Sequence, residues 1–519
     1  MRRQAPATLT QADVCPIMRV NWTVHRGHNT HMRPALQVNT VARSNNLNLS
    51  FVRARWVVVA LFFAGCAVTL AYNGPFFDEG IYIVAGIRTF EGHGMTDGYL
   101  TWFAGTLLWP MLSAIGWRVG GIVGTRAIAV LLGTASVAAA GQAAANLYGD
   151  RVGFWATLSL ALNGALISLA RLGVYDGLAL AGIAVSFWAI TELARQDHRL
   201  WLVTATLAWV AAVFAKYPIG LMVIPLLALL PILRGKRGYA DAALFLFIAA
   251  ALGLALYMPL RDQIGGFFDW RLQNKPGFGV PLKVIAYAIF YLSTVPTVMA
   301  IIGWVLSKER RQMATLLLLC LAIWPAYQLL AQDPVGTNKH IVFGFLLASP
   351  LVGVSLSRLW DLAPRVPWNK ATALLVVVGL AWLALGQVTR VDRAWPNLSA
   401  PANYLAQEVE PGDHILASEG WPITLELYDR GRLQSPWDVY DQYRLSTEPS
   451  APDVCDFDWV VDTAGSYAWS EGTRGQLAAC PSYVQVAEHT STVVNPGADL
   501  TYVAYPVTTR IWRNADGDR

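Results

Sequence analysis

The sequence predicts a polytopic α-helical membrane protein with a small α/β domain at its C-terminal end. Of the 519 residues, 55% are hydrophobic and only 14% are charged, whereas a soluble protein of this size carries about 25% charged residues. Apolar runs of the length that spans hydrocarbon as a helix, about 20 residues, recur along the chain. After about residue 390 these runs stop, so residues 53–389 are predicted to form a membrane domain and residues 390–519 a separate, soluble one.

The N-terminal region sets the predicted orientation. Residues 1–52 are polar and irregular, and we expect a disordered cytoplasmic tail. Arg53 and Arg55 precede the first apolar segment, and basic residues before a span place the N-terminus on the inner side. The next loop, residues 74–101, is therefore expected on the outer side.

The segment 102–117 decides the topology of everything that follows. It is apolar but short, and Pro110 and two glycines interrupt it. If it does not cross the membrane, the Arg and Lys residues of the later loops gather on the cytoplasmic side, as the positive-inside rule requires. We therefore predict a re-entrant or interfacial element, about eleven spans, and an extracytoplasmic C-terminal domain. The spans after the first are expected near 122–146, 153–170, 177–194, 200–215, 218–233, 241–260, 284–306, 313–331, 341–357 and 371–388.

Two adjacent carboxylates, Asp78 and Glu79, follow the first span. Acids so close to hydrocarbon are costly and are typical of functional sites. Apolar residues then recur at every third position, which predicts a helix that lies against lipid headgroups. A structural explanation fits the local sequence equally well: Asp78 would cap that helix, and Glu79 would favour its dipole. The apolar positions are Ile81, Val84, Ile87 and Phe90.

The same topology brings further ionisable groups to the outer face, and this convergence predicts a site. They are Arg171, Asp176, Lys216, the loop 261–283, Lys339 and His340. Each also has a structural explanation. Lys216 would extend its ammonium group from a helix end to the interface. Arg171 and Asp176 would form an ion pair across a helix end, and His340 would be an ordinary loop histidine.

The C-terminal domain is expected to alternate helices and strands. Strands are predicted at 414–418, 456–462 and 500–506, and helices at 403–408, 422–430 and 471–479. Cys455 and Cys480 are the two cysteines of this domain, and in an oxidising compartment they are expected to form a disulfide. Cys66 and Cys320 fall within spans and are expected as buried thiols.

A series of short motifs over residues 53–360 carries a resemblance to a known superfamily. The motifs are Asp78-Glu79, Thr125-Arg126-Ala127, Leu147-Tyr148-Gly149-Asp150-Arg151, Ala170-Arg171 with Asp176, Phe214-Ala215-Lys216-Tyr217-Pro218, and Lys339-His340 leading to Ser349-Pro350. In this order and spacing they resemble the GT-C membrane glycosyltransferases of the protein O-mannosyltransferase and lipid A aminoarabinose transferase group. The chain departs from that group where Tyr217-Pro218 follows Lys216 and where no Arg-Tyr pair lies near Lys339.

The resemblance implies an inverting enzyme of the plasma (inner) membrane. It would move a sugar, hexosyl or pentosyl, from a polyprenyl-phosphate donor to a hydroxyl of a cell-envelope lipid, glycan or protein on the outer face. Asp78 would be the base, because a hydroxyl acceptor needs a proton acceptor, and Glu79 and Asp176 would be supporting acids. The leaving phosphate needs cations. The residues expected to supply this positive charge and bind the phosphate are Lys216, Arg171, Lys339 and His340.

Other functions fit parts of the sequence. A secondary transporter or lipid flippase would explain the spans and their charges, but no paired halves with broken helices are apparent, and the charges gather at one face. An assembly protein would leave the clustered acids and lysines unexplained. No Cys/His metal spacing and no Walker loop occurs, so no cofactor is predicted, although a divalent metal stays open. The net charge of +5 reflects loop bias and gives no indication of nucleic-acid binding.

Overall fold

The protein is described here by a computed structural model, which defines residues 45–93, 106–273, 282–331, 334–361, 368–441, 444–445, 451–464, 471–494 and 504–515. Within these ranges, nine helices are long and apolar enough to cross a membrane. The bent pair α4 (Asp150–Ala161) and α5 (Gly164–Arg171) provides one more candidate span, and α7 (Leu200–Ala215) is a shorter apolar helix. A polytopic helical fold with a small C-terminal sheet is therefore confirmed.

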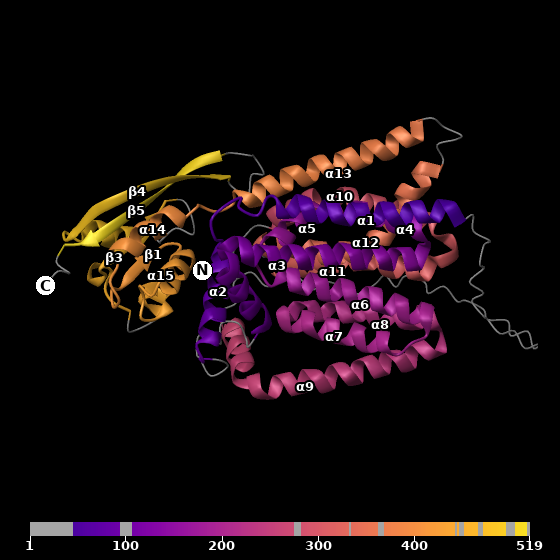
Figure 1. Ribbon diagram of the computed structural model, residues 1–519, viewed down its shortest axis with the longest axis horizontal. Helices are drawn as coiled ribbons and strands as arrows, with labels where there is room; N and C mark the ends of the chain where they lie inside the picture. The colour runs from indigo at the N-terminus through magenta and orange to yellow at the C-terminus, as the bar shows by residue number, and fades with distance from the viewer. Residues whose placement is uncertain are drawn as a thin grey trace, which may run out of the picture. The chain divides into compact units, whose positions relative to one another are not determined.

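The helices of the membrane domain pack side by side (Figure 1). Besides α4, α5 and α7 they are α1 (Asn45–Ala67), α3 (Leu108–Tyr148), α6 (Asp176–Gln196), the 3-10 turn Tyr217–Met222 with α8 (Val223–Arg234), α9 (Lys236–Gln273), α10 (Leu282–Leu306), α11 (Arg311–Ala331), α12 (Pro334–Asp361) and α13 (Trp368–Asp392). All of the apolar stretch of α12 is buried, whereas α1, α9 and α13 expose most of theirs. Helix α12 is therefore the core of the bundle, and the exposed apolar faces fit contact with hydrocarbon.

Two helix ends differ from the sequence prediction. Helix α1 begins at Asn45, so residues 45–52 are helical and not a disordered tail; residues 1–44 lie outside the described ranges. Packing explains the extension, because the Phe51 ring lies 5.9 Å from that of Phe154. Helix α9 continues to Gln273, so most of the predicted loop 261–283 is helical.

Helix α3 contains a sharp break. Its backbone is non-helical at Gly120 and Gly121, and the φ of 59° at Gly121 favours glycine. A Cβ atom placed on Gly116 would lie only 2.6 Å from Cα of Thr125, whereas nine residues of straight helix span about 13 Å. Residues 108–119 therefore fold back and do not continue the span of residues 122–148. This reversal fits the predicted re-entrant or interfacial element, of which residues 102–105 lie outside the described ranges; its membrane depth stays a prediction.

The C-terminal domain contains one five-stranded sheet with the order β2-β1-β3-β5-β4. Strands β1 (Ile415–Ala417), β2 (Val439–Tyr440) and β3 (Trp459–Thr463) are parallel, and β4 (Tyr483–Val494) and β5 (Ala504–Asn514) form an antiparallel hairpin. The helices are α14 (Ser399–Glu408), α15 (Gly420–Asp429) and α17 (Glu471–Ala479). The sequence located the helices, β1 and β3. It missed β2 and also β4, which is largely exposed and polar, and it placed β5 too early.

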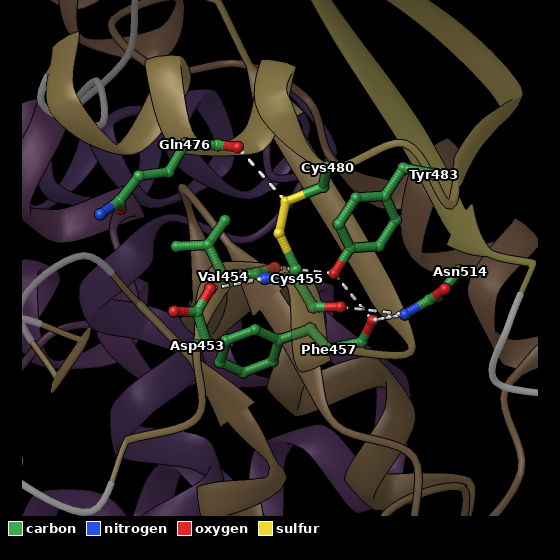
Figure 2. The surroundings of a disulfide bond; sticks show 8 residues. All are labelled: Asp453, Val454, Cys455, Phe457, Gln476, Cys480, Tyr483 and Asn514. Atoms are coloured by element: carbon green, nitrogen blue, oxygen red, sulfur yellow. Dashed lines mark hydrogen bonds between the residues drawn. A yellow bond between two sulfur atoms is a disulfide. The ribbon is translucent and has the colours of Figure 1, made fainter.

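The disulfide joins Cys455 to Cys480, with their Cα atoms 5.5 Å apart (Figure 2). Beside it, the hydroxyl of Tyr483 lies 2.8 Å from the carbonyl oxygens of both Val454 and Phe457. The bond links the turn before β3 to the end of α17, and the tyrosine ties the start of β4 to the same turn. Cys66 and Cys320 are buried thiols, as predicted.

Candidate functional site

Helix α2 (Phe77–Phe90) carries the two acids in its first turn. Its N-cap residue is Phe76, so the expectation that Asp78 caps the helix is wrong. The cap is supplied from inside the helix, because the Phe76 N–H donates to Glu79 Oε2 at 2.8 Å. Residues of the predicted lipid-facing stripe, such as Val84 and Ile87, are buried against protein, so that expectation is wrong as well.

Glu79 forms a fully buried ion pair with Arg126. The guanidinium Nε and Nη2 donate to the two carboxylate oxygens at 2.9 and 2.8 Å, and neither side chain is exposed. The backbone N–H of Gly173 also donates to Glu79, at 2.6 Å. Arg126 donates further hydrogen bonds to three backbone carbonyls between residues 70 and 74. This pair therefore connects the end of the first span, α2, α3 and the α5–α6 turn.

Asp78 has a different environment from its neighbour. Its Oδ2 atom lies 2.5 Å from the Lys339 ammonium on α12, and the two side chains are 29% and 16% exposed. The Lys339 ammonium also lies 5.1 Å from the ring centre of Phe76. The structure thus joins a partly accessible carboxylate to a cation that lies 261 residues away in the sequence.

A second ion pair, between Asp176 at the start of α6 and Lys216 at the end of α7, lies beside the first. His340 Nε2 is 4.0 Å from the same Asp176 oxygen. Lys339 interacts electrostatically with Asp78 and Asp176, and His340 with both lysines. We call Asp78, Asp176, Lys216, Lys339 and His340 the Asp78 cluster. All five were predicted as site residues.

Two of the structural explanations for these residues are wrong. Lys216 does not extend to the interface: its side chain is 6% exposed, and its ammonium lies 4.6 Å from the ring centre of Tyr175. His340 is not a loop histidine, because it lies within α12, packs on Trp324 and shares a hydrogen bond with Gln328.

Arg171 belongs to a separate group. It binds both oxygens of Asp392, at 3.1 and 2.9 Å, and the Thr69 carbonyl at 2.9 Å. The expected ion pair between Arg171 and Asp176 is therefore wrong. None of its described contacts reaches the Asp78 cluster. The ring of Tyr72 lies 4.4 Å from the Arg171 guanidinium and 4.2 Å from that of Arg126, so it connects the two buried arginines.

The C-terminal domain contacts the helix that carries Asp78. The ring of Trp421 in α15 packs edge-on against Phe77, and a Cβ atom on Gly80 would lie 2.7 Å from the Trp421 carbonyl oxygen. At the other end of α2, the Tyr428 hydroxyl donates to Glu91 at 2.5 Å. Helix α15 therefore contacts α2 near both of its ends.

Comparison with known proteins identifies the fold. The chain is similar to the apo crystal structure of ArnT from Cupriavidus metallidurans, with a TM-score of 0.53 and 14% identity over 90% of this chain and 98% of ArnT. The crystal structure of ArnT bound to undecaprenyl phosphate matches with a TM-score of 0.47 and 16% identity over the same shares. No family model and no curated protein matches the sequence. The chain therefore shares the fold of ArnT.

The structure adds residues to this region that the sequence did not indicate. Tyr82 is buried, and its ring lies 4.9 Å from that of Tyr175. Burial, followed by the neighbouring Tyr175 and the Asp78 carboxylate, raises the pKa of Tyr82 well above its ordinary value, so its phenol keeps its proton. Tyr82 lies one helical turn after Asp78, which places both side chains on the same face of the helix, so the sequence could have indicated it as a site residue. No local signal marks Tyr72 or Asp392.

The Asp78 cluster offers a carboxylate and fixed positive charge in a mostly buried setting. Among the described residues, no group of three or more His, Cys, Asp or Glu is arranged to hold a metal ion. Asp78 is the more exposed of the cluster's two carboxylates; it is paired with Lys339, and Asp176 is paired with Lys216. A carboxylate beside two ammonium groups can accept a proton while a phosphate leaves.

Proposed function

We propose that this protein is a membrane glycosyltransferase that moves a sugar from a polyprenyl-phosphate donor to a hydroxyl acceptor. The observation that supports this most strongly is the Asp78 cluster, which combines a partly exposed carboxylate with two lysines at one end of a GT-C fold. A transfer of this kind needs one base and a cationic site for the leaving phosphate. A polyprenyl chain also needs an apolar helical bundle against which to lie, and this fold provides one.

In the proposed step the acceptor hydroxyl oxygen attacks C1 of the sugar on the side opposite the phosphate. The C1–O bond to the phosphate breaks, its electron pair leaves with the phosphate, and the hydroxyl proton passes to Asp78. Attack from the opposite side inverts the configuration at C1. Asp78 is the catalytic base, because its carboxylate is the accessible one.

Lys339 links donor binding to catalysis in this proposal. Without donor its ammonium is paired with Asp78, so the carboxylate is engaged in an ion pair. An incoming phosphate competes for the same ammonium and leaves Asp78 free to accept a proton. Lys216 and His340 add positive charge and a hydrogen-bond donor to the phosphate site, while Asp176 keeps Lys216 in place.

Glu79 and Arg171 are positioning residues in this account. The carboxylate of Glu79 already accepts four hydrogen bonds from within the protein, so it fixes the direction of α2 and with it Asp78. Arg171 was predicted to bind the donor phosphate, but its contacts with Asp392 and Thr69 support a role in holding the end of α13.

The proposed location is the inner membrane, with the N-terminus cytoplasmic and the Asp78 cluster and the C-terminal domain on the outer face. Charge supports this orientation, because the helix ends opposite Asp78 are rich in cations. They include Arg151, Arg195, Arg199, Arg234, Arg237, Lys308, Arg310 and Arg311. The acceptor is proposed as a cell-envelope lipid, glycan or protein, and the sugar as a hexose or pentose; mannosyl transfer and protein glycosylation belong to this range.

Mass spectrometry of cell-envelope glycans, glycolipids and glycoproteins tests the proposal. Cells that lack the gene should lose one sugar modification, the wild-type gene should restore it, and the Asp78→Asn gene should not. Purified protein in liposomes separates the rival function: a transporter or flippase would move the labelled lipid across the bilayer without any transfer of sugar. That result, together with an unchanged envelope, would contradict the proposal.

A further inference from the structure

A cavity of about 70 Å³ lies between α5, α10 and α13 and shares no residue with the Asp78 cluster. Its wall combines apolar side chains, such as Leu292, with four polar ones. The polar residues are Ser168, Tyr291, Gln387 and Arg390. About 10–15 Å³ of such volume holds one water molecule, so the cavity has room for a tetrahedral oxyanion.

Ser168 is the most informative residue of this cavity. Hydroxyl groups on membrane helices commonly donate to the carbonyl four residues earlier, as Thr134, Thr157 and Thr206 do here. The Ser168 hydroxyl is buried, with the residue 6% exposed, and it has no hydrogen-bond partner within the described structure. A buried donor without a partner is costly, and a ligand in the cavity would satisfy it.

The charge around the cavity favours an anion. Arg390 lines it, and Arg171 lies at the end of α5, three residues after Ser168. The neighbouring acid, Asp392, is already bound to Arg171 through both oxygens. A guanidinium, a hydroxyl and a carboxamide together supply the donors that a phosphate group needs.

The surroundings of the cavity indicate where such a phosphate comes from. Apolar side chains on α10 and α13 next to it are exposed, among them Phe290 and Leu385, at 63% each. These faces fit contact with hydrocarbon, so acyl chains would lie beside the cavity. We propose that the cavity binds the phosphate of an anionic phospholipid in the leaflet that carries Asp78.

A bound lipid would brace the junction between α13 and the catalytic helix. Arg390 lies two residues before Asp392, whose carbonyl accepts a hydrogen bond from Asn73 at 3.2 Å. Asn73 in turn accepts a bond from Arg126, the partner of Glu79, through its carbonyl at 2.8 Å. This proposal stands independently of the transferase activity.

Native mass spectrometry of the full-length protein in detergent, titrated with dioleoyl phosphatidylglycerol, tests the site. Ser168→Ala removes the unpaired hydroxyl, and Arg390→Gln removes the charge. Each should weaken lipid retention by about tenfold or more, the effect of losing a hydrogen bond to a charged group. Arg393→Gln is the matched control, because Arg393 is an exposed arginine near the same helix end that does not line the cavity, and it should retain lipid like the wild type.

A cavity-filling variant, Ala165→Val, keeps every polar group and should also lose lipid; with Ser168→Ala it serves as the test if Arg390→Gln does not fold. Equal lipid retention in the wild type and the cavity variants would overturn the proposal. The proposal would also be overturned if Arg393→Gln lost as much lipid as Arg390→Gln, because lipid retention would then depend on unspecific surface charge. A second arm uses inorganic phosphate alone: thermal stabilisation equal to that given by the lipid would overturn the assignment to a phospholipid.

Discussion

Asp78 and Glu79 are neighbours in the sequence but lie in opposite environments. Glu79 is fully buried, and both of its oxygens are bound by Arg126 and by backbone N–H groups. Asp78 is 29% exposed and pairs with Lys339, which is itself partly exposed. We therefore propose different roles for these two like charges on one helical turn: Glu79 fixes the helix, and Asp78 is available for chemistry.

The arginines and the lysines of this region differ in a similar way. Arg126 and Arg171 are buried and bind carboxylates through two nitrogens each, and both lie over the ring of Tyr72. Lys216 and Lys339 hold their carboxylate partners by a single ammonium group. A planar arginine that binds a carboxylate in a bidentate way suits a permanent structural role, whereas a lysine can exchange one anion for another at a lower cost in free energy.

The largest effect is expected from Arg126→Met. It leaves Glu79 buried without a counter-charge, and breaking a buried pair in this way costs about 3–5 kcal/mol. Domains have a total stability of only about 5–15 kcal/mol, so we expect a much lower melting temperature and little folded protein. Thermal unfolding followed by tryptophan fluorescence measures this. An Arg126→Met variant that melts like the wild type would contradict the structural role proposed for Glu79 and its difference from Asp78.

A smaller effect, on binding and not on folding, is expected from Lys339→Met. Loss of a hydrogen bond to a charged group costs about 1.5–3 kcal/mol, so affinity for a polyprenyl-phosphate sugar should fall by at least about tenfold. Lys216→Met should act in the same direction when it is combined with Asp176→Asn, which removes the unpaired charge.

Arg171→Met is the control for these lysine variants. It should lower the melting temperature while the folded fraction binds donor like the wild type. Equilibrium binding of a labelled donor, corrected for folded protein, gives the comparison. A loss of affinity in Arg171→Met as large as in Lys339→Met would place Arg171 back in the phosphate site.

The smallest effect is expected at the contact between α15 and α2. Tyr428→Phe keeps the ring but removes the hydrogen bond donated to Glu91 and the one accepted from Arg88, at a cost of about 1 kcal/mol for each. We expect a small decrease in melting temperature and a nearly normal transfer rate, because Asp78 lies at the other end of α2. A rate that falls more than tenfold would show that α15 controls the catalytic helix.

The sequence predicted the part of the molecule that follows from composition and charge. Hydropathy located the spans, and loop charge placed Asp78, Asp176, Lys216, Lys339 and His340 at one end of the bundle. The sequence could not show which carboxylates are bound in buried ion pairs and which stay accessible, because that depends on which cation packs nearby. Asp392 illustrates the limit: it lies 221 residues from Arg171, and nothing in its local sequence marks it as the partner.

The comparison of Asp78→Asn with Glu79→Gln tests the central claim most directly. Both replace one carboxylate by an amide of the same shape, and both are assayed for melting temperature and for single-turnover transfer of a labelled sugar. Asp78→Asn should melt like the wild type and transfer about 10²–10⁴-fold more slowly, the range of a lost general base. Glu79→Gln should melt at a lower temperature, while its folded fraction keeps most of the rate. Wild-type transfer by Asp78→Asn, with the rate lost in folded Glu79→Gln, would contradict the account and make Glu79 the base.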